Sequence, residues 1–533
     1  MVNTGFSSKN YTLNFMMSEV KGRMQKVAIV RMEARYPTLA PYHPSKVYPE
    51  YPFSGHVGQE KNNVYEGVRE LFHALGFDQD RFGTVEWNPL CSLIEPGMTV
   101  VLKPNFVLSR HKEGKDLFAI ITHPSVLRAI ADYVWIALRG DGKIIIADAP
   151  QYDCNFQELI IATRLNEVIA FYSSFPGPKV ELRDLRNYWS RWKHFPSLLQ
   201  PLPGDPEGSV TVNLGKRSAL YGKPHSEKLY GAVYHRSETI AHHYNEIHEY
   251  ELSRTIMNAD VVISVPKLKV HKKVGVTLNA KGLVGGCTNK NYLVHYTLTP
   301  PSNGGDQYPD GLLSPLEELL IRIERWMYDH FLAPRIRPLE YLHRSVYWLH
   351  GHTLHRLGIK VDKNKRLLDA GNWYGNDSAW RMAVDLMRVF HFADRDGQIQ
   401  TTSQRRLFSV IDGIVGGDNK GPLEPDPVPA GVLLGGANFL AVDLVATRLM
   451  GFDPLKVRMY RELLEDPDFD FGLRSLDEID VISNEPGWRN CLQDRTNRFL
   501  DFKPHPGWIG HLEIQPKDRI VFFGKPNMKE NAL

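Results

Sequence analysis

Several lysines and one histidine crowd into the segment 266–286, which reads PKLKVHKKVGVTLNAKGLVGG. If the chain stays extended here, Lys267, Lys269 and His271 project to one side, because strand side chains alternate between two faces. Amines and an imidazole gathered in this way are costly to bury unless an anionic group meets them. We therefore expect a site for an anion. Lys267 and Lys269 are its candidate catalytic lysines, and His271 is the general acid–base candidate because its reference pKa lies near neutrality.

The same segment continues into a turn that should lead into a helix. Backbone N–H groups at the start of a helix, together with a lysine, suit a phosphate or carboxylate. A glycine there lets a ligand approach the backbone closely. We expect ligand contacts from Thr277, Asn279, Lys281 and Gly282. The alternative is a basic surface turn in which Asn279 caps the helix.

Polar residues also stand at the ends of the predicted strands. Each strand is a short, nearly continuous apolar run, which is typical of a strand buried on both faces of a parallel sheet. One such polar residue is more often a strand terminator. Several together favour one crevice at the carboxyl ends of the strands, where ligands bind in open α/β sheets. They are Lys103 and Asn105 after 99–103, Asp148 at the end of 143–148, Lys267 after 261–265 and Asp412 at the end of 407–412.

The stretch IDGIVGGDNKGP at 411–422 is rich in glycine, and we expect a loop over 413–421. It has neither of the spacings that define nucleotide-binding glycine motifs, so no nucleotide site is predicted. Asp412 and Asp418 could hold a divalent cation through their carboxylates. A turn with Asp418 and Asn419 in its bend is at least as good an explanation.

Three further polar residues belong to predicted helices. Asp443 lies in an apolar helical run, where a lone carboxylate is costly unless it is paired. We expect it to face Lys267 or Lys281, and the alternative is stabilisation by the positive end of its own helix. Asn376 and Arg381 stand at the start of another helix and are candidate ligand-binding residues. Arg381 could clamp an anion, while a capping role alone explains Asn376.

Strands alternate with amphipathic helices, which predicts an α/β fold with a mostly parallel sheet flanked by helices. Two segments lose this pattern and are interpreted as large insertions, the first of which partly covers the site. Histidine clusters in both, such as His242 to His248 and His343 to His355, are explained better by solvated faces than by a metal site. The predicted parts are an N-terminal arm 1–25, a first α/β part 26–184, an aromatic and histidine-rich insertion 185–250, a central strand and lysine- and glycine-rich site segment 251–300, a mainly helical insertion 301–400, and a second α/β part with the C-terminal tail 401–533.

The composition excludes several classes of protein. The net charge of +3 over 533 residues is too small to indicate a nucleic-acid partner. No run of about 18 apolar residues occurs and the N-terminus does not resemble a signal peptide, so we expect a cytoplasmic protein without a membrane span. The four cysteines include no CxxC pair, so neither a zinc site nor an iron–sulfur cluster is indicated.

Several of these motifs together resemble one protein family. They are VPKLKVHKKVGVTLNAKGLVGG at 265–286, VVLKPNFV at 100–107, IIIADAP at 144–150 and VIDGIVGGDNKGP at 410–422. In this order they are similar to the uncharacterised family named domain of unknown function 362. The resemblance implies a shared fold and a shared site but little chemistry. Some relatives carry a ferredoxin-like cysteine array that this chain lacks, which leaves a redox role only with an external electron donor.

The sequence therefore predicts an enzyme that acts on an anionic small molecule, phosphorylated or carboxylated. Lysines of the 266–286 segment would bind the anion, and the strand-end carboxylates would orient them or hold a cation. The alternatives are a non-catalytic protein that binds an anionic metabolite or saccharide, and the redox enzyme with an external donor. The reaction type, substrate and cofactor are not identified by the residues.

Overall fold

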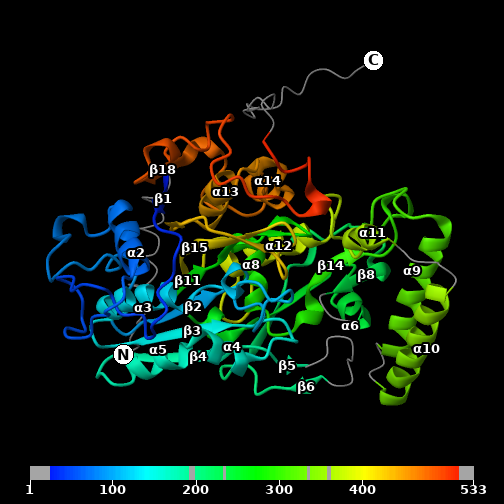
Figure 1. The fold of residues 1–533 in the computed structure, drawn as a ribbon, viewed down its shortest axis with the longest axis horizontal. Helices are drawn as coiled ribbons and strands as arrows, with labels where there is room; N and C mark the ends of the chain where they lie inside the picture. Colours follow the sequence, from blue (N-terminus) through cyan, green and yellow to red (C-terminus); the bar gives the residue numbers. More distant parts are fainter. Residues whose placement is uncertain (1–23, 191–198, 232–235, 333–335, 357–361, 515–533) are drawn as a thin grey trace, which may run out of the picture.

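A computed structural model describes residues 24–190, 199–231, 236–332, 336–356 and 362–514. Its centre is one large sheet with helices on both faces (Figure 1). The strand order is β18 (Ile479–Ser483), β1 (Gln25–Arg31), β17 (Val432–Gly436), β15 (Arg406–Asp418), β11 (Val261–Val265), β2 (Thr99–Pro104), β3 (Lys143–Asp148) and β4 (Lys179–Asp184). Along this path only β17 is antiparallel to its neighbours. The predicted α/β fold with a mostly parallel sheet is confirmed.

The sheet is buried on both faces, as its continuous apolar strands require. Val100 and Ile144 lie opposite each other on β2 and β3 and belong to one core, while the next pair, Val101 and Ile145, belongs to the other. The first core holds α2 (Asn63–Ala74), α3 (Pro124–Leu138), α4 (Phe156–Thr163) and α5 (Leu165–Tyr172). The second holds α7 (Arg254–Met257), α8 (Leu278–Gly282), α12 (Ala379–Phe392), α13 (Phe439–Leu449) and α14 (Arg458–Leu464).

The chain passes Pro266 without leaving the sheet. β11 ends at Val265, and the chain continues as β12 (Lys267–His271), which pairs in parallel with the second half of β15 and is joined by β13 (Gly275–Val276). β15 therefore runs through the predicted loop 413–421 as far as Asp418, so that prediction is wrong over most of its length. The glycines are needed for packing, because a Cβ on Gly416 would lie 2.6 Å from the Phe502 ring.

The segments predicted to be insertions build small sheets and helices outside the main sheet. β7 (Ser209–Asn213), β10 (Ile247–Ser253) and β9 (His243–Tyr244) form one sheet, β8 (Leu229–Gly231) pairs with β14 (Val294–Thr297), and β5 (Tyr188–Trp189) pairs with β6 (Gln200–Pro201). The helices here are α6 (Arg236–Ala241), α9 (Pro315–Met327), α10 (Arg337–Arg356) and α11 (Lys363–Leu368), of which α9 and α10 project at one end (Figure 1). α12 also falls within 301–400 but packs in the main core against α8 and α14.

The histidine cluster His242 to His248 belongs to a hairpin of β9 and β10. His242 pairs there with Glu249, whose Oε2 lies 2.6 Å from Nδ1. Most of the predicted N-terminal arm and the last part of the C-terminal tail lie outside the described residues. Within the described part of the chain, no helix is both long enough and apolar enough to cross a bilayer.

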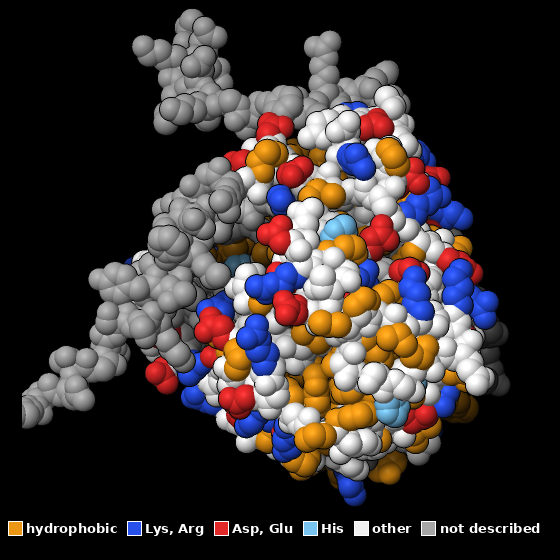
Figure 2. Space-filling model, turned by 90° about the vertical axis from the view of Figure 1, so that its left-hand side faces the viewer, with side chains coloured by type: hydrophobic (Ala, Val, Ile, Leu, Met, Phe, Trp, Pro, Cys, Tyr) orange, Lys and Arg blue, Asp and Glu red, His pale blue; other side chains and the backbone are white. Residues whose placement is uncertain are grey.

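The outer surface has no dominant charge on the face shown in Figure 2. Lysine and arginine side chains alternate there with aspartate, glutamate and apolar side chains. This mixture agrees with a net charge of only +3. The concentration of basic groups that distinguishes this protein lies inside it, at the carboxyl ends of the central strands.

Candidate functional site

A cavity of about 430 Å³ lies at the carboxyl ends of β2 and β3, beside β12. α8 and the turn after it form one wall, and β8, β14 and α9 contribute further lining. The cavity thus joins the central sheet to both predicted insertions. The predicted site residues that line it are Asn105, Asp148, Lys269, His271, Thr277, Lys281 and Gly282.

Lys103 and Asp148 form a closed ion pair at the edge of this cavity. Lys103 Nζ lies 3.0 Å from Asp148 Oδ1, and both side chains are buried. The other carboxylate oxygen accepts the backbone N–H of Phe106 at 2.8 Å. Gly285 packs so close to the pair that a Cβ there would lie 1.9 Å from Asp148 Oδ1. The charge of Lys103 is therefore balanced by Asp148, and Lys103 in turn orients that carboxylate. Lys103 does not itself line the cavity.

Lys267 and Asp412 form a second closed network, outside the cavity. Their charged atoms lie 3.0 Å apart and both side chains are fully buried. The Tyr36 hydroxyl accepts a hydrogen bond from Lys267 at 2.7 Å and donates one to Asp412 at 2.6 Å. The backbone N–H of His123 completes the set at 2.9 Å from Asp412. These contacts do not support the predicted catalytic role of Lys267 or the ligand-binding role of Asp412, because both groups are already satisfied.

The suggested cation site at Asp412 and Asp418 is also not formed. Asp412 already bonds to Lys267, Tyr36 and the backbone N–H of His123, so its carboxylate is satisfied within the protein. Asp418 accepts the backbone N–H of Lys503 at 2.9 Å. Among the residues that the structure describes, no group of three or more His, Cys, Asp or Glu is arranged to hold a metal ion.

Asp443 supports the lysine-rich segment in a way that the sequence did not predict. Its carboxylate accepts the backbone N–H groups of Asn279 at 2.8 Å and Ala280 at 2.9 Å, and the Asn279 side-chain amide at 2.8 Å. Within the described chain no lysine contacts it, so the predicted pairing with Lys267 or Lys281 is wrong. The helix it stabilises is α8, not its own helix α13. Burial raises the pKa of Asp443 to about 7, against the lowering effect of these donors.

Three other predicted ligand-binding residues are also occupied elsewhere. Asn279 is fully buried, and its carbonyl oxygen accepts a hydrogen bond from Ser409 at 3.0 Å. Asn376 accepts the backbone N–H of Ala379 at 2.8 Å at the start of α12, which is the capping alternative. Arg381 pairs with Asp377 at 3.1 Å. None of the three lines the cavity, so none is retained as a ligand contact of this site.

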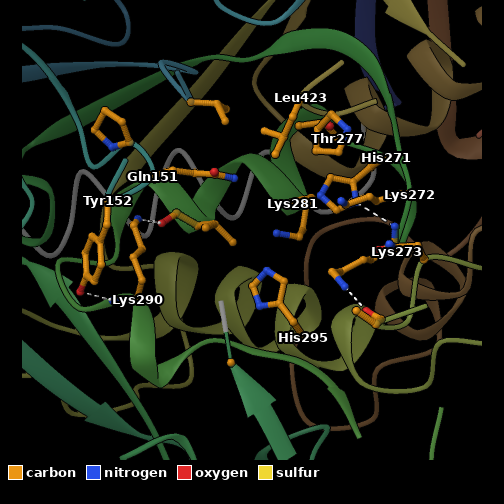
Figure 3. A pocket seen from close by; sticks show the side chains of 18 of the residues that line it. Gln151, Tyr152, His271, Lys272, Lys273, Thr277, Lys281, Lys290, His295 and Leu423 are labelled. Atoms are coloured by element: carbon orange, nitrogen blue, oxygen red, sulfur yellow. Dashed lines mark hydrogen bonds between the residues drawn. The ribbon is translucent and has the colours of Figure 1, made fainter. Parts of the chain in front are cut away.

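Four lysines of the cavity have no carboxylate partner among the described residues. Lys269 donates to Asn105 Oδ1 at 2.9 Å and to the Ile120 carbonyl at 2.6 Å. Lys290 donates to the Val284 carbonyl at 2.8 Å, and Lys273 donates to the carbonyl of Ala370. The side-chain amine of Lys281 makes no hydrogen bond or ion pair to any residue in the described part of the chain, although only 6% of the residue is exposed. Figure 3 shows its amine in the open centre of the cavity, between His271 and His295.

The missing counter-charge lowers the pKa of all four amines. Burial is the largest cause, and for each amine the charge of a neighbouring lysine lowers the pKa further. The pKa of Lys281 falls to about 7, with Lys290 as the repelling neighbour. The pKa of Lys290 falls to about 8, and those of Lys269 and Lys273 lie well below the usual range. The empty cavity is therefore an unfavourable place for positive charge, and an anion would reverse that.

The two histidines of the cavity present different ring atoms to a ligand. His271 Nδ1 accepts the backbone N–H of Lys273 at 3.1 Å, so a neutral ring carries its proton on Nε2. Burial and the Lys281 ammonium lower the pKa of His271 well below its usual value. His295 Nδ1 lies 2.9 Å from the Leu293 carbonyl and must donate to it, so Nε2 of a neutral His295 holds the lone pair. The general acid–base role predicted for His271 rested on its reference pKa, which the buried ring does not keep.

Aromatic side chains form a second, less polar part of the lining. Tyr230 and Tyr296 stack with ring centroids 5.1 Å apart. The Arg325 guanidinium lies 5.8 Å from the Tyr296 ring centre and pairs with Asp369 at 2.7 Å. Tyr328 of the same helical segment also lines the cavity. This wall offers flat apolar surface and a cation to the remainder of a ligand.

Buried polar atoms without partners also occur among the lining residues. Gln151 Oε1, Thr277 Oγ1 and Asn372 Oδ1 have no hydrogen bond within the described chain. At the start of α8, Leu278 has a φ of 44°, a left-handed conformation that costs a non-glycine residue about 1–3 kcal/mol. Unsatisfied polar groups and backbone strain gather at functional sites in proteins. Thr277 and Leu278 belong to the wall that carries Lys281, whereas Gln151 and Asn372 come from other segments of the lining.

The sequence did not point to Lys290, His295, Arg325 or the tyrosines. Their segments are irregular, or belong to short strands and helices with no periodic signal that distinguishes a cavity face. Lys290, His295 and Tyr296 lie in the predicted site segment 251–300, while Tyr230, Arg325 and Tyr328 lie in the predicted insertions. The richness of those insertions in aromatic and basic residues does not say which side chains turn inward.

Comparison with known proteins gives one match. A family model described as a domain of unknown function (DUF362) matches residues 204–448. No curated protein and no solved structure matches the chain. The matched region contains β12, α8, β14 and α9, and therefore most of the cavity lysines, whereas Asn105 and Asp148 lie before it. The resemblance stated from the sequence motifs is confirmed over these residues.

Proposed function

Taking residues 204–448 as a domain of unknown function 362, we propose that this protein is an enzyme whose cavity binds an anionic small molecule, phosphorylated or carboxylated. The proposal rests on the site itself, because the family description carries no activity. The single observation behind it is the buried Lys281 amine, which has no partner in the part of the chain that the structure describes and faces a cavity that three other lysines without a carboxylate partner there share.

An anion is the ligand that best corrects this imbalance. Each lysine of the cavity loses solvation on burial, and the hydrogen bonds that three of them make go to neutral oxygens. Removing a charge from water without a counter-charge costs several kcal/mol or shifts the pKa. A phosphate or carboxylate would accept charge-assisted hydrogen bonds from Lys281 and its neighbours, which are about twice as strong as neutral ones.

The rest of the lining suggests how such a ligand would lie. Asp148 is already bonded to Lys103 and to the Phe106 N–H, so it contributes a fixed carboxylate at one side. Tyr230, Tyr296 and Arg325 provide a flat wall on which an apolar or ring-shaped part of the ligand could pack. The anionic end would then point to the lysines of β12 and α8.

Proton transfer is the chemistry for which a group is present. His295 Nε2 is the lone-pair atom of the neutral ring, because Nδ1 donates to the Leu293 carbonyl. An imidazole held in one tautomer beside a bound anion is a suitable general base. His271 is a neutral hydrogen-bond donor in the same proposal and does not exchange a proton.

Matched ligand pairs test the binding part by titration calorimetry. We expect glycerol 3-phosphate and succinate to bind more tightly than the neutral analogues glycerol and succinamide. Lys281→Met should lower the affinity for the two anions by roughly tenfold to a hundredfold, which corresponds to the loss of one hydrogen bond between charged groups. Lys115→Met removes the same charge from an exposed ion pair and should change little. Equal affinity for charged and neutral members of each pair would refute anion binding.

The catalytic part needs a separate measurement. A mixture of phosphorylated and carboxylated metabolites is incubated with the protein, and the loss of each compound is followed by mass spectrometry. Consumption by the wild-type protein and none by His295→Gln would support the enzyme and the assigned base. Anion binding without consumption of any compound would favour a non-catalytic binding protein.

A further inference from the structure

Lys281 differs from the other lysines of the cavity in one respect. Lys269, Lys273 and Lys290 each donate to a carbonyl or amide oxygen, which fixes the amine as a hydrogen-bond donor. The side-chain amine of Lys281 donates to no described residue and stands in the open part of the cavity (Figure 3). An amine used only to bind an anion would gain from such anchoring, whereas a reacting amine must be free to lose a proton and change its geometry.

The position of Lys281 is nevertheless well defined. It lies in the short helix α8, whose first N–H groups are held by the buried carboxylate of Asp443 at 2.8 and 2.9 Å. Leu278 begins that helix in a strained left-handed conformation. The protein thus fixes the backbone of Lys281 at an energetic cost while leaving its amine unbound. That combination is expected of a residue whose amine acts as a nucleophile.

We propose that Lys281 forms an imine with an aldehyde or ketone group of the anionic ligand. This inference rests on the proposed function, because it requires the ligand to be held in the cavity by its charge. The ligand class is therefore narrowed to small carbonyl compounds that also carry a carboxylate or a phosphate. Lys269, Lys273 and Lys290 would hold the anionic group, and Lys281 would attack the carbonyl carbon.

The step balances without any co-reactant. The neutral amine nitrogen adds to the carbonyl carbon, and one amine proton moves to the oxygen to give a carbinolamine. The hydroxyl then leaves as water with the second amine proton, and the C=N bond forms. His271 offers a hydrogen bond from its Nε2–H to the departing oxygen and keeps its proton. When the imine nitrogen takes up a proton from water it withdraws electrons from the adjacent carbon, where His295 Nε2 could accept a proton.

The surroundings of Lys281 favour the neutral amine. The charged or titratable groups that act on it or respond to it are Lys290, Cys287, Lys269, His271 and Lys273. None is a carboxylate, and burial raises the pKa of the Cys287 thiol to about 11, so that thiol is neutral. With a pKa of about 7, half of Lys281 is free amine near neutral pH. An exposed lysine of ordinary pKa is free to only about one part in a thousand at that pH.

The test is reductive trapping of the full chain. The protein is incubated at pH 7 with pyruvate or with glycolaldehyde phosphate in the presence of cyanoborohydride, which reduces an imine to a stable secondary amine. The adduct is then located by peptide mapping. We expect modification of Lys281 in the wild-type chain, and its loss in Lys281→Arg, which keeps the charge but cannot form the imine. Lys115→Arg, at an exposed ion pair, is the matched control and should be labelled at Lys281 like the wild type.

Two further measurements separate this inference from the proposed function. Inorganic phosphate, which has an anionic group but no carbonyl, should compete with trapping without forming an adduct. Binding of phosphate measured by calorimetry, with no adduct at Lys281, would overturn the imine while leaving anion binding intact. If neither phosphate binding nor the adduct at Lys281 were found, both proposals would be overturned. Adducts spread over surface lysines, at equal levels in wild type and Lys281→Arg, would also overturn the imine. Thermal unfolding of Lys281→Arg, with Lys281→Gln as a second variant, establishes that the variants are folded.

Discussion

Two groups of buried lysines lie near the carboxyl ends of the central strands, and they differ in whether the protein supplies a counter-charge. Lys103 and Lys267 each meet a carboxylate at 3.0 Å, and further hydrogen bonds saturate those carboxylates. Lys269 and Lys281 are buried to a similar degree and meet no carboxylate within the described chain. The first group therefore stabilises the fold, whereas the second group is suited to a ligand that would supply the counter-charge.

The comparison teaches that burial of a lysine does not by itself mark function. What separates the groups is whether the counter-charge comes from the protein or is left for a ligand. In the first group, the removal of one partner would leave an unpaired charge buried in the interior. In the second group that situation already exists in the ligand-free protein, so a substitution there should affect binding and leave the fold stable.

The largest effect is expected from Asp412→Ala. It leaves the Lys267 ammonium buried and removes the acceptor of the Tyr36 hydroxyl. Breaking a buried pair typically costs about 3–5 kcal/mol, which denaturant unfolding would measure. A loss below about 1 kcal/mol would mean that Lys267 finds another partner, and the distinction between the two groups would then fail.

A loss of comparable size is expected from Asp443→Ala. The variant leaves the buried N–H groups of Asn279 and Ala280 without an acceptor, at about 1–3 kcal/mol for each unsatisfied group. Because α8 carries Lys281, anion affinity should fall together with stability. Full stability with unchanged binding, measured by urea unfolding and calorimetry on the same sample, would show that α8 does not depend on this carboxylate.

Two glycines of the same segment provide a matched pair. A Cβ on Gly285 would lie 1.9 Å from Asp148 Oδ1 and 2.6 Å from Lys103 Nζ, so Gly285→Ala should cost about 1–3 kcal/mol by forcing the ion pair apart. A Cβ on Gly282 would meet nothing closer than 3.8 Å, so Gly282→Ala should be neutral or stabilising by up to about 1 kcal/mol. Similar melting curves for both variants would contradict this reading of the site.

A change of opposite sign is expected from Lys281→Met. Removing a buried cation that has no ion-pair partner among the described residues should raise the free energy of unfolding at pH 7 by up to about 4 kcal/mol, because folding lowers the pKa of this amine from its usual value to about 7. The folded pKa of about 7 lies below that of the unfolded chain, so the unfolded chain binds more protons above pH 7. The contribution of Lys281 to stability therefore rises with pH between about 7 and 10.4, and this rise should be absent in the variant. A destabilised Lys281→Met would place Lys281 in the first group.

The sequence by itself determined the sheet and the region of the site. Apolar, β-branched runs such as 143–148 and 261–265 can be read as strands, because a strand buried on both faces must be apolar throughout. Pro266 ends one strand because it lacks an N–H group. The alternation of Lys267, Lys269 and His271 placed basic groups at the carboxyl edge of the sheet, where the crevice of such folds lies.

Only the tertiary structure decided which of these basic groups remain available. Tyr36 lies 376 positions from Asp412, yet it completes the network that removes Lys267 from the site. His295 enters the cavity from β14, a strand that exists because it pairs with β8 some 65 residues earlier. Asp443 proved to hold α8, and the glycines of β15 proved to be packing positions in a strand. The physical reason is the same in each case: whether a buried polar group is satisfied depends on partners that are distant in sequence, and local patterns carry no record of them.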